Sequence, residues 1–324
     1  SIDLTRDGRQ VGDLKIKWSD NRQPVGYYPV PIVCIANGTG PTLLLSGGVH
    51  GDEFEGPVAL MRLAQNLEPA TINGRVIILP ALNAPALLAS SRVSPLDGLN
   101  LNRAFPGMAD GSPTQMIAHY VESVLLPQCD AAIDLHSGGK AAIFAPCVLA
   151  EVDRDTSRGC ANLALAEAFA APYLWVSGPG NDNRSVNAAA ARQGVTMIAA
   201  ELGGGGGCDP RMTDFTEAAL RRCLKHLGII ESAPEAESPE YQAVSPGETV
   251  TAPTAGLFER RFAIGDQVEA GQTAGYLHFV NEPERASMQL EFASAGIVLA
   301  HSNRGMLERG DLIAQGQPAG VQNR

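Results

Sequence analysis

Two histidines and one glutamate carry the strongest chemical signal in this sequence. His50 and Glu53 stand in the phrase Gly-Gly-Val-His-Gly-Asp-Glu-Phe-Glu-Gly, and His136 stands much later in Asp-Leu-His-Ser-Gly-Gly. Two imidazoles and a carboxylate are a common ligand set for a catalytic zinc ion, with a fourth position open for water. The short spacing lets His50 and Glu53 reach one ion from a single turn of chain. The pattern therefore predicts metal-assisted hydrolysis.

A metal hydrolase also needs a group that moves protons between the water and the leaving nitrogen. Glu201 is the best candidate, because it ends an apolar run and is followed by Leu202 and the glycines at 203–207. A rigid strand would hold the carboxylate there. The alternative is a strand-end glutamate that only forms a salt bridge.

Positive charge occurs at Arg92 and at Asn102-Arg103 in an otherwise acidic chain. One arginine could stabilise the oxyanion of a tetrahedral intermediate. Another could bind a substrate carboxylate with two hydrogen bonds. On sequence alone, a surface ion pair explains either arginine equally well.

A rhythm of strands and helices surrounds these residues. We expect short strands within 1–40, strands over 42–46, 75–80, 131–135 and 195–200, and helices over 57–67, 114–126, 162–170 and 216–227. Such alternation predicts an α/β fold with a mostly parallel mixed sheet and helices on both faces. Sites in such sheets form at the carboxyl ends of the strands. His50, Asn83, His136 and Glu201 each follow an expected strand.

Two further carboxylates lie beside the expected ligands. Asp134 precedes His136 by two residues, so both side chains point the same way on a strand. It could orient His136 or His50, or serve a purely structural purpose. Asp52 has the same alternatives.

The last part of the sequence lacks the alternation of strands and helices and indicates short strands instead. We predict a catalytic domain over 1–235, a solvated linker over 231–240, and a small β-sandwich over 241–324 that resembles biotinyl and lipoyl carrier domains. Such carriers need a lysine, and none follows Lys225. A packing, capping or oligomerising role is therefore expected.

Composition excludes several other classes of protein. A net charge of -11 argues against a nucleic-acid surface. No apolar run approaches the roughly 20 residues needed to span a bilayer. The six cysteines form no C-x-x-C pair, which predicts free thiols in a cytoplasmic protein.

Five parts of the sequence occur in a characteristic order: His50–Glu53, Asn83–Ala86, Leu101–Gly107, Asp134–His136 and Glu201. Together they resemble the succinylglutamate desuccinylase/aspartoacylase family, a branch of the zinc carboxypeptidase superfamily. The resemblance covers roughly residues 40–230, and the C-terminal β-module also fits the family. Within the family, the sequences of these motifs are most similar to those of the bacterial branch of Nα-acetyl-L-2,4-diaminobutyrate deacetylases of ectoine degradation. The stretch between Arg92 and Asn102 is longer than in aspartoacylases proper, which bears on pocket shape.

The resemblance implies a role for each candidate residue. One Zn²⁺ per chain would be bound by His50, Glu53 and His136, with Glu201 as general base and acid, Arg92 polarising the carbonyl, and Asn102 and Arg103 holding the substrate carboxylate. The expected activity is removal of an acyl group, most simply acetyl, from a small N-acyl amino acid. Alternatives are a deacylase of another specificity, a metallocarboxypeptidase acting on peptides, or a non-catalytic scaffold. We expect a homo-oligomer with no nucleic-acid or membrane partner.

Overall fold

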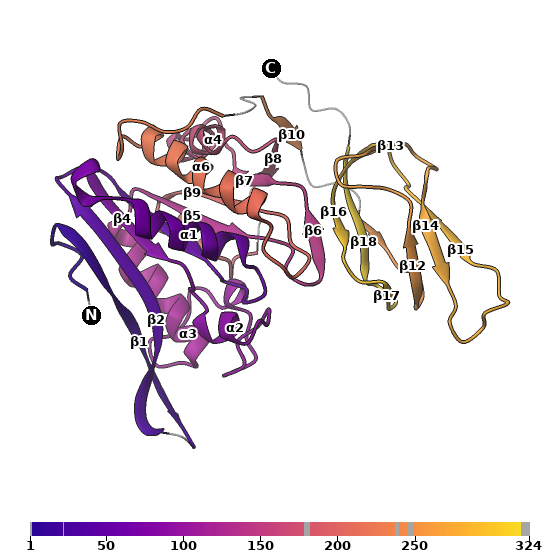
Figure 1. Cartoon of the computed structure of the whole chain (residues 1–324), viewed down its shortest axis with the longest axis horizontal. Coiled ribbons are helices and arrows are strands. Elements are labelled where there is room, and N and C mark those ends of the chain that lie inside the picture. Colours follow the sequence, from indigo (N-terminus) through magenta and orange to yellow (C-terminus); the bar gives the residue numbers. More distant parts are fainter. Residues whose placement is uncertain (1, 22, 178–181, 237–239, 245–248, 319–324) are drawn as a thin grey trace.

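A mixed β-sheet forms the centre of the molecule in the computed structural model, which describes residues 2–21, 23–177, 182–236, 240–244 and 249–318 (Figure 1). Among these residues the sheet has nine strands in the order β1-β2-β4-β3-β5-β9-β7-β8-β10. The strands are β1 (Gly8–Asp20), β2 (Gln23–Asn37), β3 (Thr42–Gly47), β4 (Gly74–Leu79), β5 (Ala131–His136), β7 (Cys147–Glu151), β8 (Tyr173–Ser177), β9 (Thr196–Glu201) and β10 (Gln242–Val244). The pairs β1–β2, β2–β4 and β7–β9 are antiparallel, and the other neighbours are parallel. The expected mostly parallel mixed sheet is confirmed.

The first two strands form a long hairpin in place of the short strands expected within 1–40. The strands pair continuously from Gly8 opposite Ala36 to Trp18 opposite Gly26, and an irregularity precedes the last pair. Leu14 and Ile16 are buried while their neighbours are more exposed. The alternation predicted strand here, but it could not show how far the pairing continues beyond the core.

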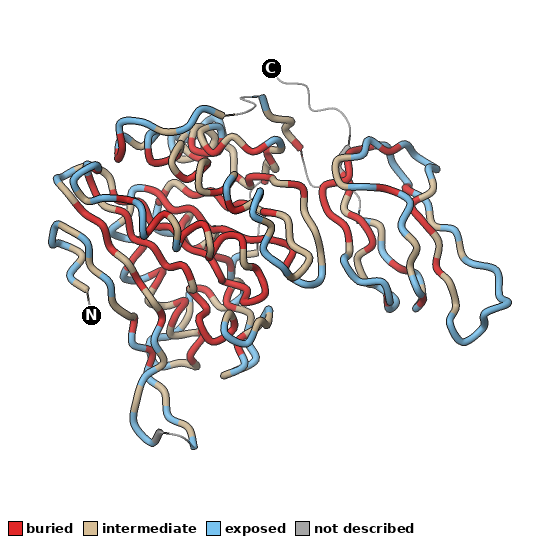
Figure 2. The backbone as a smooth tube through the Cα atoms, viewed as in Figure 1, coloured by how far each residue is buried: buried red, intermediate tan, exposed pale blue. Residues whose placement is uncertain are grey.

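The central strands are buried on both faces. Every residue of β3 and β5 is buried, as the short apolar runs predicted. Two apolar clusters lie on opposite sides of the sheet, one including Leu45 and Leu60 and the other Leu44 and Ile117. Figure 2 shows this buried layer running through the larger part of the molecule.

Helices cover both faces, as expected. They are α1 (Glu55–Asn66), α2 (Ala84–Leu88), α3 (Pro113–Tyr120), α4 (Ser157–Phe169), α5 (Val186–Arg192) and α6 (Pro210–His226). Short 3-10 turns span Pro69–Thr71, Leu101–Arg103 and Leu126–Gln128, and a π-helical turn spans Val121–Leu125. Helices α1, α4 and α6 pack together on one face, whereas α3 and α5 contribute to the cluster on the other.

Some elements differ from the sequence expectation. Helix α6 begins at Pro210, well before the expected start at 216, because Asp209 caps it by accepting from the N–H of Arg211. Helix α5 and strands β7 and β8 carry too little periodicity to be predicted. None of the six cysteines, all of which the structure describes, forms a disulfide.

The C-terminal β-module has two antiparallel sheets around its own apolar core. One contains β11 (Thr249–Thr251), β13 (Gln267–Val268), β16 (Gly296–Ser302) and β18 (Leu312–Pro318), and the other β12 (Gly256–Arg260), β14 (Thr273–His278), β15 (Met288–Glu291) and β17 (Met306–Leu307). Phe262, Leu277 and Val298 belong to the shared core. The expected β-sandwich is confirmed.

Two strands connect the module with the larger sheet. Strand β10 follows the segment expected to be a linker, of which residues 237–239 lie outside the described part, and it pairs with β8. Strand β6 (Ala142–Phe144) lies between β5 and β7 in the sequence but pairs with β16 of the module and not with the larger sheet. Within the described residues, no helix is long and apolar enough to cross a membrane.

Candidate metal centre

The loop between β3 and α1 presents His50 and Glu53. This loop packs directly on α2, because a Cβ added to Gly51 would lie 1.9 Å from the carbonyl carbon of Ala86. The N–H of Gly51 also donates to the carbonyl oxygen of Ser91 at 3.0 Å. Only glycine permits this close approach, which holds the loop that carries His50 and Glu53 against α2.

Strands β5 and β9 bring the other expected residues to the same edge. His136 is the last residue of β5 and lies opposite Glu201, the last residue of β9, in their parallel ladder. Residues from three distant parts of the sequence therefore meet at the carboxyl end of the sheet, as the sequence predicted.

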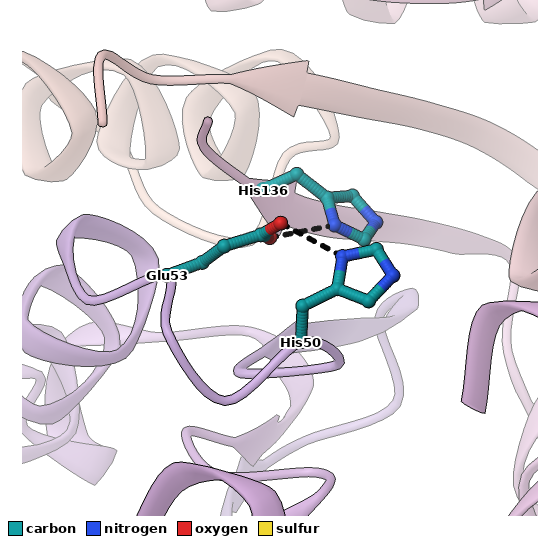
Figure 3. Close-up of side chains that lie close together, drawn as sticks. All are labelled: His50, Glu53 and His136. Carbon is teal, nitrogen blue, oxygen red and sulfur yellow. Dashed lines mark hydrogen bonds and ion pairs between the residues drawn. The ribbon is translucent and has the colours of Figure 1, made fainter. Parts of the chain in front are cut away.

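His50, Glu53 and His136 converge closely enough to hold one metal ion (Figure 3). Their ligand atoms all lie within 4.8 Å of one another. Nδ1 of His50 lies 2.7 Å from Oε1 of Glu53, and Nδ1 of His136 lies 2.9 Å from Oε2. All three side chains are buried, at 5%, 3% and 7% exposure respectively. Among the described residues, this is the group of His, Cys, Asp and Glu side chains suited to a metal.

The outer nitrogen of each imidazole is occupied by an oxygen acceptor. Nε2 of His136 lies 2.7 Å from Oδ2 of Asp134, and Nε2 of His50 lies 3.2 Å from Oδ1 of Asn100. The backbone N–H of Asn102 also donates to this Asn100 atom, which identifies it as the oxygen. Each histidine thus donates through Nε2 and turns Nδ1 towards Glu53. This is a common arrangement for metal-ligating histidines.

Sequence reasoning anticipated Asp134 but missed Asn100. Asp134 contacts His136 and not His50, and its other oxygen accepts from the hydroxyl of Ser46 at 2.7 Å. The sequence around Asn100, Asn-Leu-Asn-Arg, indicates only that this residue caps the turn of Leu101–Arg103. Its proximity to His50 depends on how the long loop folds back.

The charge state of the centre follows from burial and from mutual contact. Burial opposes ionisation of Glu53, yet the charge and hydrogen bonds of His136 and His50 lower the pKa of its carboxyl to about 2. Burial lowers the pKa of His50, despite Glu53 beside it. Burial acts in the same direction on His136, but Asp134 and Glu53 raise its pKa well above the usual range. Glu53 is therefore an anion, and His50 is neutral at neutral pH.

Glu201 lies beside these three residues, and one of its two carboxylate oxygens forms no hydrogen bond. Its Oε2 is buried and has no hydrogen-bond partner among the described residues, although the residue as a whole is partly exposed. Burial raises the pKa of this carboxyl to about 8, against the influence of His136. The sequence left open that Glu201 only forms a salt bridge at the end of its strand. Among the described residues, Glu201 has no such partner.

Arg92 reaches the centre from the loop after α2. Its guanidinium Nη1 lies 3.3 Å from Oε1 of Glu53, while half of the side chain, 52%, is exposed. The arginine therefore borders the buried ligands and faces solvent. Lys140 anchors the same loop by donating from Nζ to the carbonyl oxygen of Ser90.

Asn102 and Arg103 lie further out. Oδ1 of Asn102 accepts from the N–H of Val186 at the start of α5, at 3.0 Å. Nε of Arg103 lies 3.0 Å from Oδ2 of Asp182, which also binds Arg184. The first four residues of this loop, 178–181, lie outside the described part.

Comparison with known proteins agrees with the geometry. Residues 39–227 match the model of the succinylglutamate desuccinylase/aspartoacylase catalytic domain. The chain belongs to this family. As a member of the succinylglutamate desuccinylase/aspartoacylase family, it is a hydrolase that removes acyl groups, and its fold matches that of the family.

Similar proteins cover nearly the whole chain. The N-alpha-acetyl-L-2,4-diaminobutyric acid deacetylase of Halomonas elongata is 36% identical over 317 residues, which are 97% of this chain and 93% of the relative. A succinylglutamate desuccinylase/aspartoacylase structure from Rhodobacter sphaeroides is 37% identical, with a TM-score of 0.92 and 98% of each chain covered. The product-bound ectoine utilization protein EutE (DoeB) of Ruegeria pomeroyi is 35% identical, with a TM-score of 0.94 and the same coverage.

Proposed function

We propose that this family member is a zinc-dependent deacetylase with Nα-acetyl-L-2,4-diaminobutyrate as its substrate. One observation carries the metal part. Nδ1 of His50 and Nδ1 of His136 lie 2.7 and 2.9 Å from the two oxygens of the buried Glu53 carboxylate, while Nε2 of each ring faces an oxygen acceptor. Two imidazole nitrogens turned towards one buried carboxylate are the surroundings of a catalytic metal cation. The donor set therefore fits a bound cation.

The two imidazoles and the carboxylate support zinc as the metal. Nitrogen ligands with a single carboxylate are typical of catalytic zinc, whereas magnesium and calcium prefer oxygen. When bound by His50, Glu53 and His136, zinc would polarise a carbonyl group and lower the pKa of a water molecule.

Glu201 is suited to move the proton of the attacking water. A carboxyl whose pKa lies near neutrality can accept a proton and then donate it to the leaving amine. The buried, unpartnered Oε2 is the atom that we assign to this transfer. The ladder with His136 holds it beside the proposed metal site.

Arg92 is suited to stabilise the developing oxyanion. It is the cation that borders Glu53, and its exposed half leaves guanidinium donors for a substrate. Donors placed beforehand at a developing charge are worth about 3 kcal/mol each in activation free energy.

Asn102 and Arg103 are suited to hold the α-carboxylate. Because Oδ1 of Asn102 is committed to Val186, only the Nδ2 donors remain for a ligand. The guanidinium of Arg103 already binds one carboxylate, that of Asp182. A substrate carboxylate would share or displace this pair.

The substrate proposal rests on the relatives that cover the chain. The Halomonas protein is named for deacetylation of the diaminobutyric acid derivative, and the Ruegeria protein for ectoine utilization. A hydrolysis screen tests it. Nα-acetyl-L-2,4-diaminobutyrate should exceed N-acetyl-aspartate, N-succinyl-glutamate and N-formyl-amino acids in kcat/KM by more than about tenfold. A higher value for another N-acyl amino acid would replace the substrate. Cleavage of short peptides but of no acyl amino acid would favour a carboxypeptidase.

Metal analysis tests the ligand set. His136→Ala should reduce the zinc-to-protein ratio from about one to near zero, because two of three ligands bind a zinc ion far more weakly. His226→Ala is the matched control, since His226 lies exposed at the end of α6. An unchanged ratio in His136→Ala would refute the ligand assignment.

A further inference from the structure

The glycine loop that follows Glu201 has an unusual backbone. Residues Gly203, Gly204, Gly205 and Gly206 all have positive φ, at 76°, 130°, 87° and 80°. A run of glycines loses more conformational entropy on ordering than any other sequence. Bonds from outside must hold this loop, and Glu201 lies two residues before it.

Residues 138–144 provide the first of these bonds. The carbonyl oxygen of Gly203 accepts from the N–H groups of Gly138 at 3.0 Å and Phe144 at 2.9 Å. The N–H of Gly205 donates to the carbonyl oxygen of Ala142 at 3.0 Å. This segment begins two residues after His136. The loop after the proposed base is therefore attached to the loop after a proposed metal ligand.

The C-terminal β-module holds the same segment from its other side. Strand β16 pairs with β6, with Ala300 opposite Phe144 and Ser302 opposite Ala142. Ile143 of β6 forms an isolated bridge to Gly204 in turn. Strand β6 therefore lies between the module and the glycine loop (Figure 1).

Asn303, the residue after β16, contacts both loops at once. Its backbone N–H donates to the carbonyl oxygen of Ala141 at 2.8 Å. Its side-chain Nδ2 lies 3.3 Å from the carbonyl oxygens of Lys140 and of Gly205. One carboxamide group has two N–H donors, and here each has a carbonyl acceptor on a different loop.

We propose that Asn303 is a positioning residue for the hydrolysis: its side chain joins the loop after His136 to the glycine loop and so fixes Glu201 relative to the metal ligands. The module then acts as part of the catalytic framework. This inference rests on the proposed function only for the role of Glu201. The bridge between the two loops is independent of any substrate.

The substitution Asn303→Asp separates hydrogen bonding from shape. Aspartate has the same size but no N–H donors when ionised, and it places a charge against two carbonyl oxygens. Asn303→Ala removes the side chain altogether. The matched control is Asn281→Ala, because Asn281 is exposed and lies between β14 and β15, in the sheet of the module that does not pair with β6.

Hydrogen exchange and steady-state kinetics are measured on the full-length zinc-loaded protein. The amides of residues 203–207 should exchange faster than in wild type in both Asn303 variants, and at the wild-type rate in the control. We expect kcat to fall by about threefold to tenfold, and further in the aspartate variant, because two modest hydrogen bonds are lost. KM should change little, since Asn102 and Arg103 lie on other elements, and the zinc content should stay constant.

Each outcome decides one link of the inference. Wild-type exchange at 203–207 in both variants would overturn the bridge. Faster exchange with wild-type kcat would overturn the positioning role. A parallel loss of zinc would show that Asn303 supports the metal ligands and not Glu201. A wild-type protein inactive on every acyl amino acid would overturn the proposed function, whereas the exchange data would still show whether the bridge exists.

Discussion

His136 and Glu201 are paired residues in the ladder of β5 and β9, and each is the last residue of its strand. The backbone hydrogen bonds of two buried strands thus set the separation of a proposed metal ligand from the proposed base. The loops that follow the two strands, both of which Asn303 contacts, then hold the strand ends relative to each other. This relationship explains how a carboxylate with an unpartnered oxygen stays in place.

Replacing Glu201 by glutamine should abolish most turnover. Glutamine keeps the size of the side chain but cannot accept and release a proton, and general acid–base catalysis contributes about 10²- to 10⁴-fold. We expect kcat to fall by this factor while the zinc content, measured by mass spectrometry, is unchanged. A kcat within about threefold of wild type would remove Glu201 from the mechanism.

The stability of the metal-free protein should depend on the ionisation of Glu201. Burial raises the pKa of its carboxyl from 4.5 to about 8 on folding. The stability from this group is fully present below about pH 4.5 and is lost as the pH rises through about 8. Glu201→Gln lacks this loss, so its Tm advantage over wild type should grow between about pH 5 and pH 8. Calorimetry in the presence of a chelator measures it, and a constant difference would contradict the assigned pKa.

The acceptors behind the two histidines should control metal affinity. Asn100→Ala removes the oxygen that accepts from His50, and Asp134→Asn weakens the acceptor of His136 by removing its charge. Loss of such contacts costs about 10- to 100-fold in metal affinity. Competition with a chromophoric chelator gives the Kd for zinc. Asn183→Ala is a suitable control, and equal affinities in all four proteins would show that these contacts do not act on the metal.

The close contact at Gly51 should make this position intolerant of any side chain. In Gly51→Ala the new Cβ would lie 1.9 Å from the Ala86 carbonyl carbon, so the loop of His50 must shift. Such overpacking costs about 1–3 kcal/mol in the free energy of unfolding. Gly207→Ala is the control, because a Cβ there meets nothing within 4 Å. Urea denaturation compares the two variants, and equal midpoints would show that the loop adapts freely.

Much of the fold could be predicted from local patterns. The apolar runs of β3 and β5 are short and wholly buried, and such runs have few other solutions in a chain of this kind. The N-terminal hairpin and α5 were predicted less well or not at all. Their length and position depend on pairing partners far away in the sequence, and local periodicity carries no record of these partners.

Residue types and spacing alone predicted the chemistry of this protein. Two histidines, a glutamate and a strand-end glutamate predict a metal, a proton carrier and an edge of the sheet where they meet. Tertiary structure decided which partner each of them has. Asn100 rather than Asp134 contacts His50, and Asn303 of the module contacts the glycine loop. These contacts join residues separated by 50 and 98 positions. Only the folded packing of loops, whose conformations no short-range pattern specifies, brings them together.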